Sequence, residues 1–334
     1  MNNTIAVDHS FHNENALVEV CGLKKYFPVE KNGFFNNRNV KAVDNVSFNI
    51  LRNETLGLVG ESGCGKSTLG RTLIYLYAPT DGKVFFEGQN LGMLNPNELK
   101  KYRRKMQFIF QDPSASLNPR RTVHSILMEP FIIHKVGTPM EREERIRFLM
   151  DRVGMEEYYL SRYPHEMSGG QKQRIGVARA LALNPKLIVC DEAVSALDVS
   201  IQAQVINLLV ELQKEFKLTY LFISHNLNII SFMSDRVATM YLGQIVELGS
   251  QDAIYEHTLH PYTKALISAI PHTDMEMEHP KRILLTGDVP SPVNPPNGCR
   301  FHTRCDYRMD ICEQEAPALK EVEQGHYVAC HLMG

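Results

Sequence analysis

The residues with the clearest chemical potential form a glycine-rich loop near residue 60. The segment 60–67 matches the pattern G-x-x-x-x-G-K-[ST], follows the apolar run 56–59 and precedes a helical pattern over 68–76. Backbone N–H groups of such a loop wrap phosphates, Lys66 would reach the β and γ phosphates, and the Ser67 hydroxyl would bind Mg²⁺. The sequence therefore predicts a nucleotide site with the loop residues Gly60, Ser62, Gly63, Cys64, Gly65, Lys66, Ser67 and Thr68.

An acidic pair follows a second apolar run. Residues 187–190 have the pattern of a buried parallel strand, and Asp191 and Glu192 come directly after them. Asp191 would hold Mg²⁺ through water, and Glu192 could polarise the attacking water. A charged strand end that merely enters a loop is the alternative interpretation of the pair on its own.

A second helix N-terminus is expected at residue 168. Ser168 and Gln171 fit an S-x-x-Q capping box that opens a helix over 172–183, with no strand before it. A helix N-terminus attracts anions, although an isolated capping box is equally typical of an ordinary helix. In one chain with the glycine-rich loop and the pair after residue 190, this segment resembles the signature motif of the ATP-binding cassette (ABC) ATPases.

The resemblance extends to other motifs of that family, in the same order. Tyr26 matches the aromatic residue that stacks on adenine, Gln111 the Q-loop residue that contacts Mg²⁺ and senses the membrane partner, and His225 the switch histidine. Residues 195–198, SALD, match the D-loop. Taken singly, these residues also fit an edge-strand aromatic, a polar loop residue and a helix cap.

The resemblance implies a role for each matching residue. The catalytic residues would be Glu192, His225 and Gln111, and Ser67, Gln111 and Asp191 would hold Mg²⁺. In this family the signature of one subunit completes the phosphate site of the other, so that ATP joins two such domains face to face. The residues that act on the partner's site would be Ser168, Gly169, Gly170 and Gln171.

Two positions depart from the family pattern. Ala193 stands where proline is usual, and Asn226 stands where aspartate is common. Neither change removes a group assigned to phosphate or metal, so we expect activity to be retained.

The rest of the chain predicts the elements that position these residues. Its 334 residues are 43% hydrophobic, enough for one large core and a smaller annex. A separate C-terminal module is expected where composition shifts to Pro, Cys and His after residue 260. The remaining expectations are strands at 17–20 and 46–50, a hairpin turn at Asp81-Gly82, a helical stretch over 112–182, strands at 187–190 and 218–223, and a hairpin over 236–247.

The family resemblance implies the fold class and the domains. The fold would be α/β: an ABC-type P-loop NTPase domain with a RecA-like core and antiparallel β and helical subdomains, plus a small Cys-rich C-terminal domain. The expected boundaries are a flexible N-terminus at 1–16, an ATPase domain at 17–255 with its helical subdomain at about 112–182, and an extension at 256–334.

Within the family, the chain looks like a separate ATP-binding subunit, because it has one nucleotide domain and no run of ~20 apolar residues. The segment 111–120 and His260-Pro261-Tyr262 resemble the dipeptide and oligopeptide permease ATPases, and most closely the second ATPase subunit of the dipeptide permease. The resemblance implies a paralogous ATPase partner, two membrane permease subunits, an external peptide-binding protein and a place at the cytoplasmic face of the inner membrane. Nickel and glutathione importers share this architecture, so the cargo, the partner and the hydrolysing site stay open.

Nucleic-acid partners are not expected. The formal net charge of -2 gives no global basic field, and the basic run 100–105 is interpreted as the solvated face of a helix before a strand at 107–110. A soluble ABC ATPase of ribosomes or DNA is disfavoured by the single P-loop and the lack of heptads. A nucleotide sensor without turnover is disfavoured by the complete set of site residues.

Four of the seven cysteines crowd the last forty residues: Cys299, Cys305, Cys312 and Cys330. Four thiolates can hold an iron–sulfur cluster, whereas the C-x₂₋₄-C pairs usual for zinc are lacking. The pattern also resembles the cysteine module of the peptide-permease ATPases, which is linked to [4Fe–4S] binding. A cluster with a structural or redox-sensing role, a zinc ion and a metal-free tail remain open.

Overall fold

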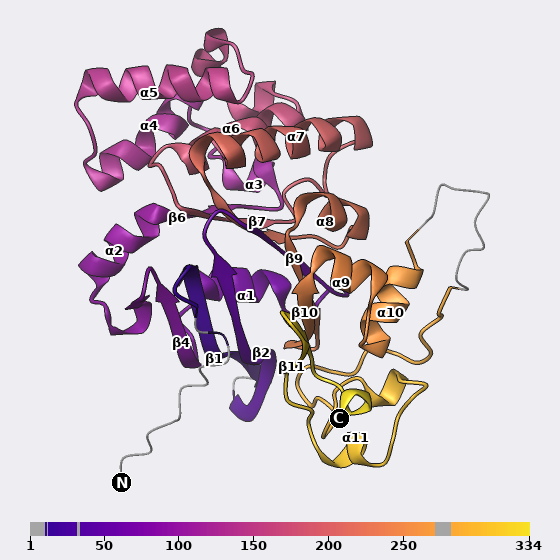
Figure 1. The fold of residues 1–334 in the computed structure, drawn as a ribbon. Coiled ribbons are helices and arrows are strands. Elements are labelled where there is room, and N and C mark those ends of the chain that lie inside the picture. Colours follow the sequence, from indigo (N-terminus) through magenta and orange to yellow (C-terminus); the bar gives the residue numbers. More distant parts are fainter. Residues whose placement is uncertain (1–10, 12, 32–33, 271–281) are drawn as a thin grey trace, which may run out of the picture. The chain divides into compact units, whose positions relative to one another are not determined.

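The computed structural model of the chain describes residues 11, 13–31, 34–270 and 282–334, with the side chains of 30–37 left aside (Figure 1). The chain divides into two compact units. The first contains residues 1–51, 55–92 and 225–334, and the second contains residues 52–54 and 93–224. In the segment 1–16, which is predicted to be flexible, residues 1–10 and 12 lie outside the described residues, whereas Phe11 is buried and Ala16 begins β1.

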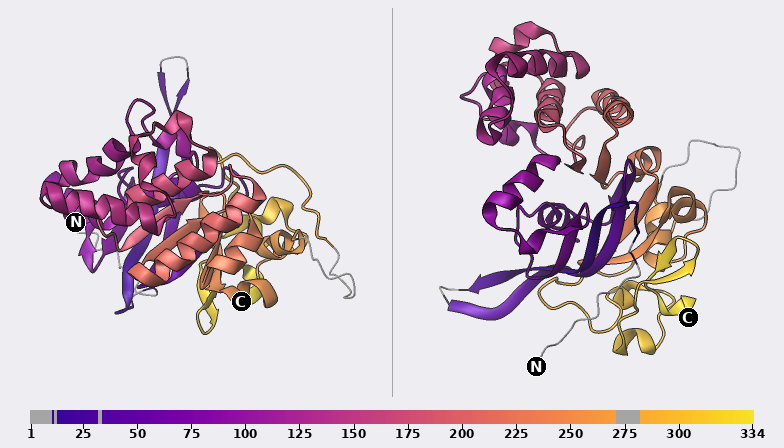
Figure 2. Two further views of the ribbon diagram at one scale, coloured as in Figure 1. Left: turned by 90° about the horizontal axis from the view of Figure 1, so that it is seen from above. Right: turned by 60° about the vertical axis from the view of Figure 1, so that its left-hand side comes forward.

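The first unit contains an antiparallel sheet in the order β2-β1-β4-β5. Its strands β1 and β2 run as a long ribbon (Figure 2). The strands predicted at 17–20 and 46–50 are confirmed as the paired ends of this ribbon, where Val18 lies opposite Ile50 and Val20 opposite Phe48. The bounds are β1 Ala16–Lys31, β2 Phe34–Leu51, β4 Asp81–Phe86 and β5 Gln89–Asn90.

The hairpin turn predicted at Asp81-Gly82 is wrong. Both residues lie inside β4, where Asp81 pairs with Lys24 of β1 and the register shifts beside it. Gly82 has a positive φ of 85°, and an added Cβ would lie 2.4 Å from the Gly22 carbonyl oxygen. The Asp-Gly pair therefore marks an irregularity in the pairing of β1 and β4. Such an irregularity, like a hairpin turn, requires glycine.

The second sheet of this unit has the order β11-β12-β10-β9-β3. Strands β3 and β9 are parallel, and β9 and β10 form an antiparallel hairpin. The hairpin predicted over 236–247 is confirmed, and its turn residues Leu242 and Gly243 both have positive φ, as a tight type I′ connection requires. The bounds are β3 Thr55–Val59, β9 Arg236–Tyr241, β10 Gln244–Ser250, β11 Lys320–Glu323 and β12 His326–Val328.

The C-terminal residues pack on the β9–β10 hairpin. A buried cluster joins Tyr241, Tyr262 and Phe301, whose ring centroids lie 4.7–5.4 Å apart. Figure 1 shows the same association, with the yellow C-terminal segment beside β10 and α10. The helices of this unit are α1 Lys66–Leu73, α8 Leu227–Met233, α9 Gln251–Glu256, α10 Pro261–Ser268 and α11 Ile311–Gln314.

The second unit combines three parallel strands with a group of packed helices. The strands have the order β8-β7-β6, and every residue of β7 and β8 is buried, so the predicted strands at 107–110, 187–190 and 218–223 are confirmed. Helices α4 to α7 pack against one another (Figure 1). The bounds are β6 Met106–Ile109, β7 Leu187–Asp191, β8 Thr219–Ile223, α2 Pro96–Lys105, α3 Pro113–Ser116, α4 Val123–His134, α5 Pro139–Arg152, α6 Gly169–Leu181 and α7 Val199–Phe216.

The basic run 100–105 ends helix α2, and β6 follows it, as predicted. Basic residues in a last turn complement the partial negative charge of a helix C-terminus. Among the residues that the structure describes, no helix is long and apolar enough to cross a membrane.

Candidate nucleotide-binding site

The glycine-rich loop joins β3 to α1 in the first unit, where the motif requires it. Gly65 precedes α1 with a φ of 110°, and an added Cβ would lie 2.0 Å from the carbonyl oxygen of Ala42. At Gly60, with a φ of 150°, an added Cβ would lie 2.1 Å from the carbonyl oxygen of Met240. Both positions therefore require glycine, which lets the loop pass close to β2 and β9.

Lys66 lies over this loop with its ammonium group directed at the loop's own carbonyls. Its Nζ donates to the carbonyl oxygens of Gly60 at 2.7 Å and Glu61 at 3.0 Å, and the residue is 5% exposed. A buried ammonium held in this way can exchange carbonyl oxygens for phosphate oxygens with little movement.

The other loop residues differ in exposure. Ser62 and Gly63 are exposed, whereas Ser67 and Thr68 are half-buried in the first turn of α1. Cys64 is buried, its N–H bonds the Glu61 carbonyl at 3.3 Å, and burial raises the pKa of its thiol. The first turn of α1 contains no acidic residue, so no side-chain charge there opposes an anion.

Tyr26 lies in β1 opposite Lys41 of β2, and it lies beyond Lys24, where the pairing of β1 with β4 ends. Its hydroxyl donates to Asp44, and its N–H donates to Thr80 Oγ1 at 2.9 Å. Burial, followed by the hydrogen bond to Asp44, raises the pKa of Tyr26 above its ordinary value of 10.0. The phenol therefore stays neutral, as a ring that stacks on a base should.

The acidic pair and the Q-loop glutamine meet in the second unit. Asp191 ends β7 and is fully buried. Gln111 follows β6, and its Nε2 donates to Oε2 of Glu192 at 2.8 Å. Parallel strands end at one edge of a sheet, which explains how residues 81 positions apart become hydrogen-bonded. The structure thus joins two of the three predicted catalytic side chains.

Glu192 has an unusual backbone. Its φ is 48°, its N–H bonds the Ile223 carbonyl at 2.9 Å, and its own carbonyl accepts the N–H and hydroxyl of Ser195 at 3.1 and 3.0 Å. A non-glycine residue in this region costs of order 1–3 kcal/mol, which the surrounding bonds must offset. Ala193, the residue that departs from the family pattern, is 2% exposed beside it.

The signature segment forms the capped helix that the sequence predicts. Ser168 Oγ accepts the Gln171 N–H at 3.3 Å, and Gln171 Oε1 accepts the Ser168 N–H at 2.9 Å. Ser168 and Gly169 are exposed, whereas Gly170 faces α7 so closely that an added Cβ would lie 2.5 Å from Ile201 Cγ2. The helix begins three residues earlier than predicted, at Gly169.

His225 is exposed at the start of the first unit's third segment, whereas Glu192 and Gln111 belong to the second unit. The alternative that His225 caps a helix is wrong, because the cap of α8 is Asn226, whose Oδ1 accepts the N–H groups of Asn228 and Ile229 at 3.0 and 3.4 Å. The departure at residue 226 thus has a structural role that aspartate would also fill.

The sequence analysis missed a set of residues that hold the loop and Tyr26. Tyr262 Oη accepts the N–H of Glu61 at 2.8 Å, and Arg304 bonds both carboxylate oxygens of Glu61 at 2.8 and 3.1 Å. Arg300 donates to Asp44, the partner of Tyr26. The only signal in the sequence is the motif His260-Pro261-Tyr262, because the two arginines carry no recognisable pattern.

The four C-terminal cysteines lie near one another without forming a close metal site. Burial, together with a smaller effect of the thiols of Cys312, Cys330 and Cys305, raises the pKa of Cys299 to about 11. The Cys299 N–H bonds the Cys312 carbonyl at 2.8 Å. Within the described part of the chain, no three His, Cys, Asp or Glu side chains lie close enough to share one metal ion.

Comparison with known proteins establishes the class first. An ABC transporter family model matches residues 43–195. A dimeric ATP-binding cassette, MJ0796, solved in a post-hydrolysis state with ADP and Pi, is 29% identical with a TM-score of 0.62, covering 70% of this chain and 98% of that one. The chain is thus an ABC-type P-loop ATPase with the mixed α/β fold that the sequence predicts.

The family follows from the C-terminal region and from full-length relatives. A model of the oligopeptide/dipeptide transporter C-terminal region matches residues 246–312. The oligopeptide transport ATP-binding protein AppF of Bacillus subtilis is 54% identical over 96% of this chain and 98% of its own. A putative peptide import ATP-binding protein of Brucella ovis is 50% identical over 95% and 98%. The chain belongs to the family of ATP-binding subunits of oligopeptide/dipeptide ABC transporters.

Proposed function

We propose that this chain hydrolyses ATP to energise the uptake of di- or oligopeptides. The observation that supports this most is the combination of a phosphate loop, the Gln111–Glu192 pair and a capped signature helix with the C-terminal region of peptide transporters. The chain would act at the cytoplasmic face of the inner membrane, as a heterodimer with a paralogous ATPase, beneath two permease subunits that receive peptide from an external binding protein.

The same proposal assigns the domains and the ATP ligands. Residues 17–255 would be the ATPase domain, with residues 112–182 as its helical subdomain, and 256–334 the extension. Tyr26 would stack on adenine, residues 60–68 would hold the phosphates, and Ser67, Gln111 and Asp191 would hold Mg²⁺. The exposed N-terminus of α6 at Ser168 and Gly169 would face the partner's ATP.

The cargo is tested by transport in proteoliposomes that contain the complete transporter with its binding protein. Uptake of labelled di- and tripeptides that requires internal ATP is the expected result. Transport of nickel or glutathione in place of peptides would overturn the peptide assignment while leaving the ATPase assignment unchanged. Proteoliposomes that contain the transporter without its binding protein serve as the control.

We further propose that the segment 299–330, which contains the four cysteines and is called the cysteine module below, holds an iron–sulfur cluster. Three of its sulfurs accept a backbone N–H from two residues ahead: Cys299 from Phe301, Cys305 from Tyr307 and Cys330 from Leu332. Such bonds stabilise a thiolate. A single zinc ion requires sulfurs at about 2.3 Å from the metal, which the described side-chain positions do not provide.

The ligands of the cluster would be Cys299, Cys305, Cys312 and Cys330. When bound, the cluster would supply a folding centre to a segment with few apolar side chains, and one-electron redox chemistry.

Iron, acid-labile sulfide and zinc analysis of anaerobically purified protein tests the cluster. Equal iron and sulfide in the wild type, lost in Cys299→Ser and retained in Cys21→Ser, is the expected result. Cys21 lies in β1 and is a matched control, since it is a half-buried cysteine outside the module. Zinc alone, or no metal, would overturn the proposal.

A further inference from the structure

Two buried arginines link the cysteine module to the ATP site, and both lie beside cysteines. Arg300 follows Cys299, and Arg304 precedes Cys305. The side chains of Arg300 and Arg304 are 8% and 7% exposed. The ion pairs that they form are therefore not on the surface. Their partners belong to β2 and to the phosphate loop, respectively. All of these residues lie in the first unit.

Arg304 holds the phosphate loop from outside. Its guanidinium pairs with both carboxylate oxygens of Glu61, the second residue of the loop. It also lies over the ring of Tyr241, 6.0 Å from the centroid, in the aromatic cluster that contains Tyr262. Tyr262 accepts the Glu61 N–H, so the side chain and the backbone of Glu61 are fixed by two different elements.

Glu61 in turn bears on the phosphate-binding groups. Its carbonyl accepts a hydrogen bond from Lys66 Nζ at 3.0 Å and from the Cys64 N–H at 3.3 Å. A shift of Glu61 would therefore move the ammonium group and the N–H groups that meet phosphate. A bidentate arginine pair fixes orientation as well as charge, which a lysine would not reproduce.

Arg300 holds the adenine side of the site. One end of its guanidinium donates to the Leu242 carbonyl in the β9–β10 turn, and the other donates to Asp44. Asp44 accepts the Tyr26 hydroxyl on its other oxygen, and its N–H bonds the Gly243 carbonyl at 2.8 Å. The arginine thus neutralises a carboxylate that would otherwise be buried without a cation beside the tyrosine.

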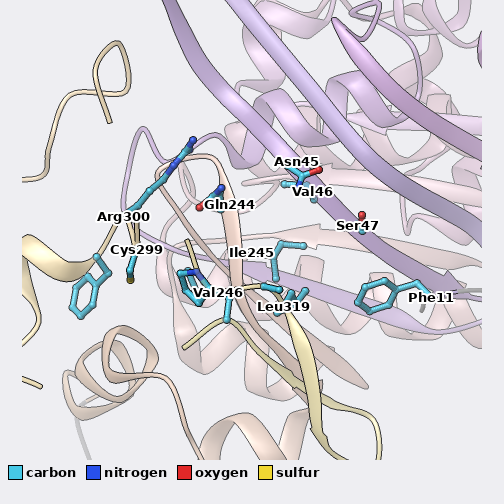
Figure 3. A pocket seen from close by; sticks show the side chains of 14 residues that line it. Phe11, Asn45, Val46, Ser47, Gln244, Ile245, Val246, Cys299, Arg300 and Leu319 are labelled. Carbon is cyan, nitrogen blue, oxygen red and sulfur yellow. The ribbon is translucent and has the colours of Figure 1, made fainter. Parts of the chain in front are cut away.

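A cavity lies beside the contact between Arg300 and Asp44. It has a volume of about 160 Å³ and lies between β2, β10 and the module. Figure 3 shows Cys299 and Arg300 at one end of it and Phe11 at the other. Val46 and Ser47 line the same cavity, and beside it the Arg300–Asp44 pair joins the module to β2.

We propose that Arg300 and Arg304 are positioning residues of the ATP site, Arg300 orienting Tyr26 through Asp44 and Arg304 fixing the phosphate loop through Glu61. The cysteine module thereby sets the affinity for ATP. This inference rests on the proposed roles of Tyr26 and the phosphate loop, and it does not require that the module hold iron.

The test compares MgATP with inorganic triphosphate and Mg²⁺, because triphosphate binds the loop without a base. Arg304→Gln should weaken both ligands about tenfold, which corresponds to about 1.4 kcal/mol. Arg300→Gln should weaken ATP by a similar factor and leave triphosphate unchanged. Arg308→Gln, an exposed arginine of the same module, should change neither. Binding is measured by calorimetry on the purified full-length chain.

Further variants separate positioning from loss of fold. Glu61→Gln and the double variant with Arg304→Gln should show the same loss, since each breaks the same pair. Wild-type affinities in Arg300→Gln and Arg304→Gln would overturn the proposal. Additive losses in the Glu61→Gln, Arg304→Gln double variant would overturn the coupling of these two residues. If Tyr26→Ala leaves ATP affinity unchanged, the role of Tyr26 fails instead. Thermal unfolding of the nucleotide-free variants checks that each one is folded.

Discussion

Gln111 and Glu192 are joined by a hydrogen bond of 2.8 Å between Nε2 and Oε2. The bond orients the carboxylate of Glu192 through one of its oxygens, and a general base must be held in a fixed orientation to accept a proton from water.

Replacement of Gln111 tests this bond. Gln111→Ala should lower the turnover number about tenfold or more, with a smaller change in KM for ATP, because the base loses its orienting donor. The measurement is steady-state release of phosphate by the assembled transporter. Gln107→Ala is the matched control, since Gln107 lies in β6, the strand that precedes Gln111, and its Nε2 donates to the Arg103 carbonyl. Equal losses in the two variants would exclude an orienting role for Gln111.

Removal of Lys66 tests the phosphate loop. Lys66→Ala loses a charged donor held 2.7 Å from the Gly60 carbonyl, and a hydrogen bond from a charged group contributes about 1.5–3 kcal/mol. ATP affinity should therefore fall about 10- to 100-fold, measured by nucleotide titration. Lys101→Ala on α2 is the control, because Lys101 is exposed. An unaltered ATP affinity in the first variant would contradict the phosphate assignment.

Two glycines of α6 provide a test of the signature helix. At Gly170 an added methyl would lie 2.5 Å from Ile201, whereas nothing lies within 4 Å of one at Gly176. Gly170→Ala should displace the first turn of α6, costing about 1–3 kcal/mol, and reduce turnover with ATP binding by the isolated chain retained. Gly176→Ala should stabilise the helix by up to about 1 kcal/mol and keep turnover. Lower stability and turnover in Gly176→Ala than in Gly170→Ala would refute the packing argument.

Acid should destabilise the protein through His260. Burial lowers the pKa of this residue from 6.5 to about 4, and its Nδ1 accepts the Tyr262 N–H at 3.0 Å. Between these two pH values the unfolded chain binds more protons, so stability falls as pH falls from 6.5 towards 4, by roughly 3 kcal/mol at most.

Denaturant unfolding at several pH values measures this loss. His260→Asn keeps an acceptor for the Tyr262 N–H without a titrating ring, so its stability should depend less on pH in this range. His257→Asn, next to the same helix, is the control. A pH dependence in His260→Asn equal to that of the wild type would assign the effect to other groups.

Local patterns in the sequence predicted the elements that carry chemistry. Three elements depend on residues only a few positions apart: the phosphate loop, the buried strand before Asp191 and the capping box of Ser168 and Gln171. Local sequence is therefore enough to predict them. The family resemblance then related these segments to one another. The outlier is Asp81-Gly82, where a bulge and a turn require the same residue types and only the pairing with β1 separates them.

Long-range pairs could not be predicted in this way. Glu61 and Arg304 are 243 positions apart, and Asp44 and Arg300 are 256 apart. Charged residues at such separations pair only because the C-terminal segment packs on the β9–β10 hairpin, which is a property of the fold. The same holds for Gln111 and Glu192, which the sequence marked separately and the sheet brings together.

Hydrolysis by Glu192→Gln tests the central claim most directly. The amide keeps the size of the side chain and removes the base, so the purified variant should bind MgATP with wild-type affinity and release no phosphate above background. Glu211→Gln, an exposed residue of α7, should hydrolyse ATP normally. Phosphate release by Glu192→Gln at the wild-type rate would contradict the account, because the reaction would then proceed without the only base that it assigns.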